Sequence, residues 1–223
     1  MGKILYTRNG EKGSQNFLAA NVIDIRPNKD DNHPYVIVVS ASVYVRSEGE
    51  ESGHYERKTI QLQSWPQNEW NRIERIKKMK LQKGSFIVCT VGNLKEYTPK
   101  DGGNSILQGL LFNITYNTAY TIQDGDKEFF LLCGTVRNVH EYKKDGSAEI
   151  EVGYNAFDSE SQKRHLETYT VMVNDKTFAS LKKAGIAKGG SLAAIGTLED
   201  KELTAKRAEF GARVKKDEPA KKS

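Results

Sequence analysis

The sequence has few of the residues that usually indicate a membrane, a metal or a disulfide framework. Its 223 residues include two cysteines, four histidines and five prolines. No apolar run is long enough to cross a bilayer, and the opening MGKILYTRNG has no apolar signal core, which predicts a cytoplasmic protein. The scattered histidines show no zinc-ligand spacing, so no metal and no other cofactor is predicted. Cys89 and Cys133 each lie in an apolar run and are interpreted as buried core thiols.

Sequence signatures of catalysis are also missing. The chain has no Walker A run, no HExxH and no paired-carboxylate cluster with an obvious partner. The acidic pairs Asp30-Asp31 and Glu50-Glu51 fall in predicted turns, where solvated loops are the default interpretation. We therefore predict that the protein is not an enzyme.

The charge balance permits an anionic partner without requiring one. Lysine and arginine number 34 against 29 acidic residues, which gives a net charge of +5 and a pI near 9.0. The mean hydropathy of -0.64 indicates a polar chain, whose core must be small or divided between small units.

The first half of the chain shows short runs typical of strands. Strands are predicted over 17–27, 35–46, 55–65, 86–97 and 106–122, the last of them broken or bulged. The run 35–46 alternates apolar residues with polar ones such as Ser40, Ser42 and Tyr44. Between the third and fourth strands, residues 68–82 have helical periodicity, with Trp70 on the apolar side.

The second half repeats this order of elements. Strands are predicted over 129–142, 148–157 and 165–174, then a helix over 175–185, then a strand after Ser191 and a last one over 205–214. Asp175 is the predicted N-cap of the helix, and Gly185 its C-terminal stop.

One phrase occurs twice, about a hundred residues apart. Residues 82–98 read QKGSFIVCTVGNLKEYT and residues 188–204 read KGGSLAAIGTLEDKELT, each at the start of the predicted fourth strand. A five-stranded barrel with a helix between strands three and four is the OB-fold. The predicted fold class is thus mainly β, with two tandem OB-fold barrels. The predicted domains are residues 1–124, residues 128–212, and a flexible basic tail over 213–223.

The run from ERKTIQLQSW through the helix to KGSFIVCTVGNLKEYTPKDGG resembles the bacterial and phage single-stranded DNA-binding protein family. The match is good over about 35–124 and weaker over 129–210. By resemblance, two barrels in one chain imply a homodimer with four barrels. The family usually ends in an acidic, phenylalanine-tipped tail, whereas this chain ends RVKKDEPAKKS, which favours a phage or mobile-element origin.

Binding a single strand without sequence preference requires aromatic platforms for bases and cations for phosphates. The first barrel has both on faces predicted to point away from the core, and Tyr44, Trp65 and Tyr97 fall about where the family carries its stacking aromatics. Trp65 is equally compatible with packing in the core. The candidate residues of this barrel are Tyr44, Arg46, Arg57, Trp65, Lys95, Tyr97 and Lys100.

The second barrel has a thinner set of aromatics. Its candidate contacts are Tyr142, Lys143 and Phe157, with Lys144 and Arg164 nearby. We therefore predict weaker nucleic-acid binding there, or a role in subunit contact.

The leading hypothesis is a single-stranded DNA-binding protein that coats and protects DNA in replication, recombination or repair, with possible protein partners from those processes. The alternatives are an OB-fold module that binds protein and an RNA-binding protein. Steep salt dependence would separate nucleic-acid binding from protein binding. Stacking on an OB surface does not by itself distinguish DNA from RNA.

Overall fold

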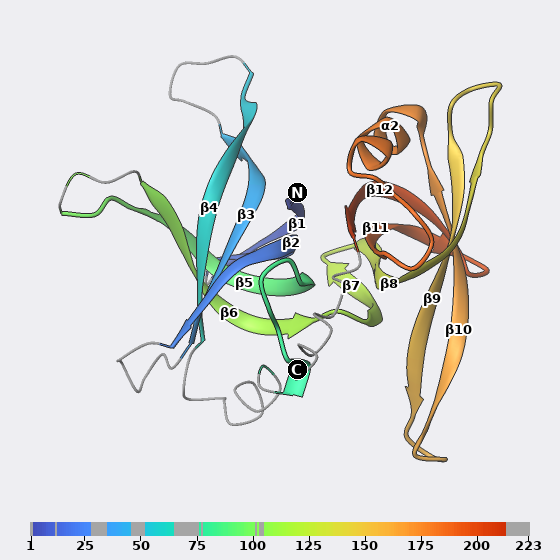
Figure 1. The fold of residues 1–223 in the computed structure, drawn as a ribbon, viewed down its shortest axis with the longest axis horizontal. Coiled ribbons are helices and arrows are strands. Elements are labelled where there is room, and N and C mark those ends of the chain that lie inside the picture. Colours follow the sequence, from blue (N-terminus) through green and yellow to red (C-terminus); the bar gives the residue numbers. More distant parts are fainter. Residues whose placement is uncertain are drawn as a thin grey trace, which may run out of the picture.

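The computed structural model describes residues 2–11, 13–27, 35–45, 52–64, 76, 78–100, 102 and 105–212. These residues form two six-stranded sheets that lie side by side, the first built from the N-terminal half and the second from the C-terminal half (Figure 1). The strands of the first sheet are β1 (Lys3–Gly10), β2 (Gly13–Pro27), β3 (Tyr35–Val45), β4 (His54–Ser64), β5 (Phe86–Tyr97) and β6 (Ile106–Thr115). The second contains β7 (Thr118–Asp124), β8 (Lys127–Glu141), β9 (Ala148–Asp158), β10 (Lys163–Val173), helix α2 (Asp175–Lys183), β11 (Ser191–Glu199) and β12 (Glu202–Gly211).

Five strands of each sheet close into a barrel. In the first barrel, β2 pairs with β3, β3 with β4, β4 with β6 in parallel, β6 with β5, and β5 back with β2. In the second barrel, β8, β9, β10, β12 and β11 pair in the same order, again with one parallel pair, β10 with β12. This closed order, with the parallel pair between strands three and five, is the OB-fold. The predicted fold class is confirmed.

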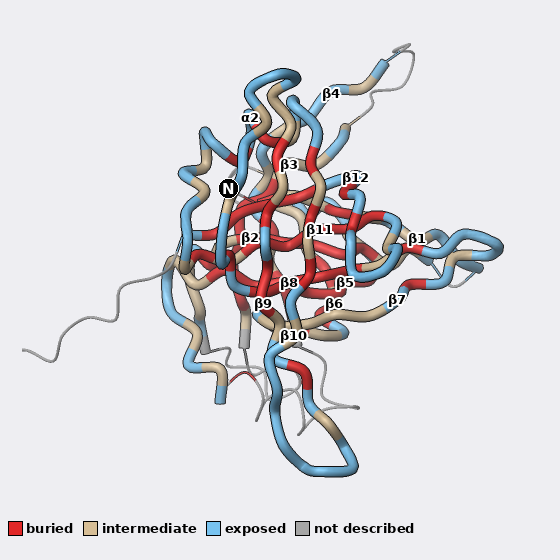
Figure 2. The backbone as a smooth tube through the Cα atoms, turned by 90° about the vertical axis from the view of Figure 1, so that its right-hand side faces the viewer, coloured by how far each residue is buried: buried red, intermediate tan, exposed pale blue. Residues whose placement is uncertain are grey.

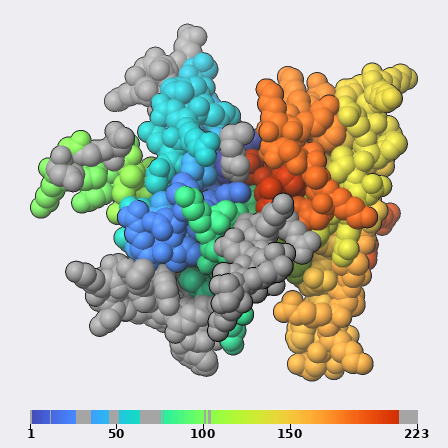
Figure 3. Space-filling model, in the orientation of Figure 1, coloured from blue at the N-terminus to red at the C-terminus, as the bar shows by residue number. Residues whose placement is uncertain are grey.

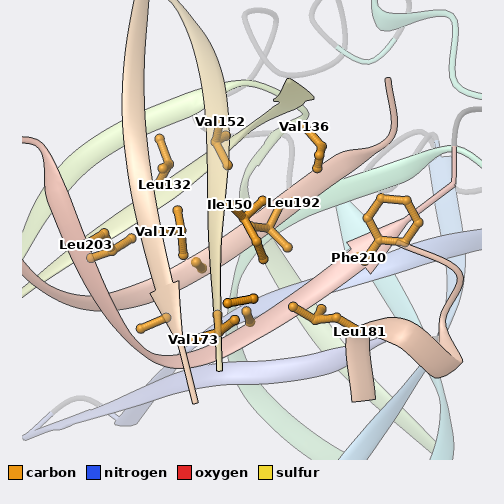
Figure 4. Packing of buried hydrophobic residues seen from close by; sticks show 14 of the residues in the cluster. Leu132, Val136, Ile150, Val152, Val171, Val173, Leu181, Leu192, Leu203 and Phe210 are labelled. Atoms are coloured by element: carbon orange, nitrogen blue, oxygen red, sulfur yellow. The ribbon is translucent and has the colours of Figure 1, made fainter. Parts of the chain in front are cut away.

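Each barrel has its own apolar core. Buried positions alternate along several strands, as in β4, where Ile60 and Leu62 are fully buried and Gln61 between them is not. In the second barrel, Ile150, Val171 and Leu192 converge from three strands on one cluster (Figure 4). Buried residues concentrate in the middle of the molecule, whereas the long hairpin of β9 and β10 ends in exposed residues (Figure 2).

The repeated phrase marks the same turn in both barrels, as predicted, but with a shift of one residue. Gly84 donates its N–H to the carbonyl of Val22 at 2.8 Å, and Gly189 donates to the carbonyl of Val136 at the same distance. Both glycines have positive φ, 88° and 87°, which only glycine adopts without strain. Gly84 therefore corresponds to Gly189, although the Gly-Ser pairs in the sequence suggest Gly190.

The predicted fifth strand over 106–122 is two strands, and the second of them belongs to the other sheet. The strand breaks at Asn117, whose backbone N–H and carbonyl both bond to the hydroxyl of Thr115, at 3.2 and 2.9 Å. The side-chain amide of Asn117 also donates to the carbonyl of Asn155 and accepts its backbone N–H, both at 3.0 Å. Residues 118–124 then pair with β8, not with the first barrel. Strand β1, which the sequence did not predict, pairs with β2 in the equivalent way.

The two helices that the sequence predicted have different outcomes. The prediction over 68–82 lies largely outside the described residues, although Ile76 is helical and buried. Helix α2 begins at Asp175, as predicted, but its N-cap is Asn174, whose side chain accepts the N–H of Thr177 at 2.9 Å. Asp175 lies in the first turn instead. Gly185 ends the helix with a φ of 78°, as predicted.

A third apolar cluster joins the two barrels. It combines residues of β1, β2 and β5 with residues of β7, β8 and β11, and the Tyr6 and Phe129 rings lie 4.6 Å apart in it. Polar contacts surround it: the Tyr6 hydroxyl donates to Asp124, and Arg8 donates to the Gln123 carbonyl at 3.1 Å. Burial, aided by Asp124, raises the pKa of Tyr6 to about 12. The barrels thus pack as two lobes in direct contact (Figure 3).

Both cysteines are buried, as predicted. Cys89 lies in the core of the first barrel and Cys133 in the cluster between the barrels. Burial raises the pKa of the Cys133 thiol to about 12 and also raises the pKa of Cys89. Thiols in such surroundings are unreactive.

Candidate nucleic-acid interface

The first barrel has an outer face, defined as the side of β3, β4, β6 and β5 turned away from its core. On β3 and β4, Tyr44 lies directly opposite Tyr55, with ring centroids 5.4 Å apart in an edge-to-face arrangement. Each tyrosine is 54% exposed, so their rings present apolar surface to solvent. The Tyr44 hydroxyl accepts the N–H of Gly53 at 2.9 Å, which fixes the position of the ring.

Arg57 lies on the same face, one pair of residues further along β4. Its Nε donates to the hydroxyl of Ser40 at 2.7 Å, and the residue as a whole is exposed. Ser40, expected on the polar face, is only 9% exposed. This hydrogen bond orients the guanidinium, whose remaining N–H groups are available to a phosphate.

The other half of the outer face lies on β5 and β6. Gln61 of β4 is opposite Gln108 of β6, and Gln108 is opposite Lys95 of β5, so these three side chains form one row. Tyr97 follows two residues after Lys95, on the same face, and is 45% exposed. Lys100 is exposed in the turn that follows β5.

The two tyrosine positions are far enough apart for several nucleotides. From the Tyr44–Tyr55 pair to Tyr97, which lies level with Thr59 of β4, the path runs about 13 Å along the strands and about 10 Å across them. Tyr44, Arg57, Lys95 and Tyr97, predicted separately from the sequence, are thus brought onto one surface.

Negative charge is directed away from this surface. The four strands contain two carboxylates, Glu56 and Glu96, which alternate with the outward-facing residues and so lie on the opposite side. Lys58 is 3.0 Å from Glu56 and 3.8 Å from Glu96. Its hydrogen bond and charge lower the pKa of Glu56. The outer face therefore carries cations without competing carboxylates.

Some predicted residues fall outside the described part of the chain. They are Arg46 and Trp65, together with Trp70, which was predicted to lie in the core. Their roles stay predictions.

The candidate residues of the second barrel fall into two separate groups: Lys143 and Lys144 follow Tyr142 after β8, whereas Arg164 of β10 lies opposite Phe157 of β9. Tyr142 donates its hydroxyl to Glu149 and packs edge-on against His140, with centroids 4.9 Å apart. The hydrogen bond to Glu149 raises the pKa of Tyr142. Lys143 is exposed in the turn after it, near the start of β9, whereas Phe157 lies nine residues along that strand, about 30 Å away.

The second barrel also differs in charge and shape. Its strands β11 and β12 meet in a tight turn at Asp200 and Lys201, both with positive φ, whereas β5 and β6 extend into a long arm (Figure 1). It therefore has no counterpart of the arm that carries Tyr97 and Lys100. The strands that correspond to the outer face contain seven carboxylates: Glu149, Glu151, Asp158, Glu167, Glu199, Glu202 and Glu209.

Tyr55 was not predicted from the sequence as a residue of this surface. It starts the predicted third strand and shares the alternation of Arg57, which was the signal available in the sequence. Only the hairpin register reveals that it lies opposite Tyr44.

No three histidine, cysteine or acidic side chains gather as a metal site in the described residues. Within the same ranges, no helix is long and apolar enough to cross a membrane.

No family model matches the sequence, and no curated protein matches it. Among solved structures, the crystal structure of wild-type single-stranded DNA binding protein from Thermus aquaticus matches with 16% identity, over 92% of this chain and 96% of that one. That protein and the members of the family that the sequence resembles are both single-stranded DNA-binding proteins. The TM-score is 0.26. The OB-fold assignment rests on the strand order of this chain.

Proposed function

We propose that this protein binds single-stranded DNA without sequence preference, chiefly on the outer face of the first barrel. The observation that supports this proposal is the register of β3, β4, β6 and β5, which aligns exposed tyrosines with cations on a face where these strands place no carboxylate. Tyrosine rings stack on any base, and lysine and arginine neutralise phosphates whatever the sequence.

In this proposal the protein has no catalytic step of its own. It coats and protects single-stranded intermediates of replication, recombination or repair, in the cytoplasm of a bacterial cell or a phage-infected host. It acts as a homodimer, and its protein partners come from those processes. The second barrel binds DNA more weakly, because its aromatics are dispersed and its strands are richer in carboxylates.

The experiment that tests the proposal is a titration of labelled oligo-dT followed by fluorescence anisotropy, with Tyr44→Ala as the key variant. Loss of one stacking ring should weaken binding by about tenfold, since a stacked base contributes about 1–3 kcal/mol. Tyr44→Phe retains the ring and should bind like the parent protein, which separates stacking from the hydrogen bond to Gly53.

Tyr116→Ala is the matched control, because Tyr116 is 53% exposed and lies off the outer face, in the short segment that links β6 to β7. Equal affinities for Tyr44→Ala and Tyr116→Ala would remove Tyr44 from the site. Absence of binding to oligo-dT, oligo-U and duplex at low salt would overturn the proposal and favour a protein-binding module. Preference for oligo-U would indicate RNA.

A further inference from the structure

A cleft of about 750 Å³ lies where the two barrels meet, next to the outer face. Tyr44 and Tyr55 of the first barrel line one side, and Lys206 and Arg207 of β12 in the second barrel line the other. The two tyrosines therefore belong both to the outer face and to the cleft. A ligand that stacks on them has a direct route towards the second barrel.

The cationic pair sits at a β-bulge that occurs in both barrels. In the second barrel the register shifts between Ile195 and Gly196, opposite Lys206. In the first barrel it shifts between Thr90 and Val91, opposite Phe112. Bulges change the direction of the side chain at the extra residue.

The corresponding positions in the first barrel carry no charge. By this register, Phe112 and Asn113 of β6 stand where the second barrel has Lys206 and Arg207. Those two residues line a second cleft of about 430 Å³ between the barrels. The related clefts thus differ in chemistry, and the one that adjoins Tyr44 has the lysine–arginine pair.

The electrostatics of the larger cleft suit a phosphate. None of its described lining residues is acidic. The Lys206 ammonium lies 4.5 Å from the centre of the Phe129 ring, and Arg207 donates to the Ile4 carbonyl at 3.1 Å. Both side chains are exposed, and their remaining N–H groups are available for charge-assisted hydrogen bonds.

We propose that this cleft is the second part of the DNA path: the strand leaves the outer face at Tyr44 and Tyr55 and continues between the barrels, where Lys206 and Arg207 contact its phosphates. This inference rests on the proposed function and deepens it. The second barrel then contributes to binding chiefly by supplying the far wall of the first barrel's site.

The test compares Lys206→Glu with Lys188→Glu, each in the full chain, using an oligo-dT longer than the roughly 16 nucleotides that one OB-fold covers at most. Lys188 is an exposed lysine in the loop before β11 and does not line the cleft, so its variant makes the same change in charge elsewhere. Lys206→Glu should weaken binding severalfold and reduce the salt slope by about 0.7 per lost phosphate contact. Lys188→Glu should change both quantities much less.

Two further measurements make the outcome decisive. Lys206→Gln keeps a long side chain and removes only the charge, so it should reproduce the reduced slope if Lys206→Glu proves unstable in thermal unfolding. If the parent protein binds and the salt slope is the same in Lys206→Glu, Lys206→Gln and Lys188→Glu, the cleft path is overturned. The proposed function would still stand. Failure of the parent protein to bind oligo-dT would overturn both.

Discussion

At the scale of single residues, the face a side chain occupies decides what it can do. Tyr55 and Glu56 are neighbours in the chain, yet one lies exposed beside Tyr44 and the other pairs with Lys58 on the opposite side of the strand. This separation follows from the two-residue period of a strand. It allows a chain with nearly balanced charge to present a surface that suits an anion.

Glu209 is a carboxyl buried in β12, and it gives the protein a testable dependence on pH. Burial is the largest influence and raises the pKa of Glu209, while the charge of Lys3 opposes the rise. Below a pH of about 4.3, the ordinary pKa of a glutamate, Glu209 is protonated in both the folded and the unfolded state, so its burial does not lower the free energy of unfolding. As pH rises through the higher pKa of the folded state, the buried carboxyl loses its proton and the free energy of unfolding falls.

Glu209→Gln removes the titrating group, so its stability relative to the parent protein should increase as pH rises from about 4 to about 8. Urea midpoints at the two pH values measure the difference. Glu199→Gln, which changes an exposed carboxyl on β11, is the control. If Glu209→Gln differs from the parent protein in stability by the same amount at both pH values, the raised pKa of Glu209 is contradicted.

At the scale of elements, the turn before the fourth strand of each barrel depends on a glycine. Gly189 has a φ of 87°, and a methyl group added there would meet no atom within 4 Å. Gly189→Ala should therefore destabilise the protein through backbone strain alone, by about 1–2 kcal/mol. Urea unfolding measures the loss.

Gly10→Ala is the matched control for this element. Gly10 lies at the end of β1 outside the positive-φ region, and an added methyl group would find its nearest atom at 3.7 Å. It should change stability far less. Equal effects of the two substitutions would show that the left-handed conformation is not what the turn requires.

At the scale of the whole molecule, the shared cluster between the barrels should make them unfold together. Phe129 is 7% exposed and packs on Tyr6 from the other barrel. Phe129→Ala should cost about 3–5 kcal/mol and weaken the coupling between the lobes. Hydrogen exchange of peptides from β3 and from β9 reports the first and the second barrel separately.

The two signals should give coincident urea transitions in the parent protein and separated transitions in Phe129→Ala. Phe157→Ala, which truncates a phenylalanine that is 54% exposed on the second barrel, should leave the transitions coincident. Separate transitions in the parent protein would show that the cluster does not couple the barrels.

The sequence by itself determined most of the strands, though not β1 or the break between β6 and β7, together with the repeat and the fold class. These depend on local periodicity and on turn residues such as Gly84 and Gly185. It also identified Tyr44, Arg57, Lys95 and Tyr97 as outward-facing, since alternation fixes the face of a strand residue. Alternation does not specify which strand lies beside another, or in which register.

Only the tertiary structure decided which residues meet. It placed β7 with β8 rather than with β6, because hydrogen bonds at Asn117 break the strand. It also brought Lys206 to the cleft lined by Tyr44, 162 positions earlier in the chain. Such proximity arises from packing between two closed barrels, and no local pattern of residues encodes it.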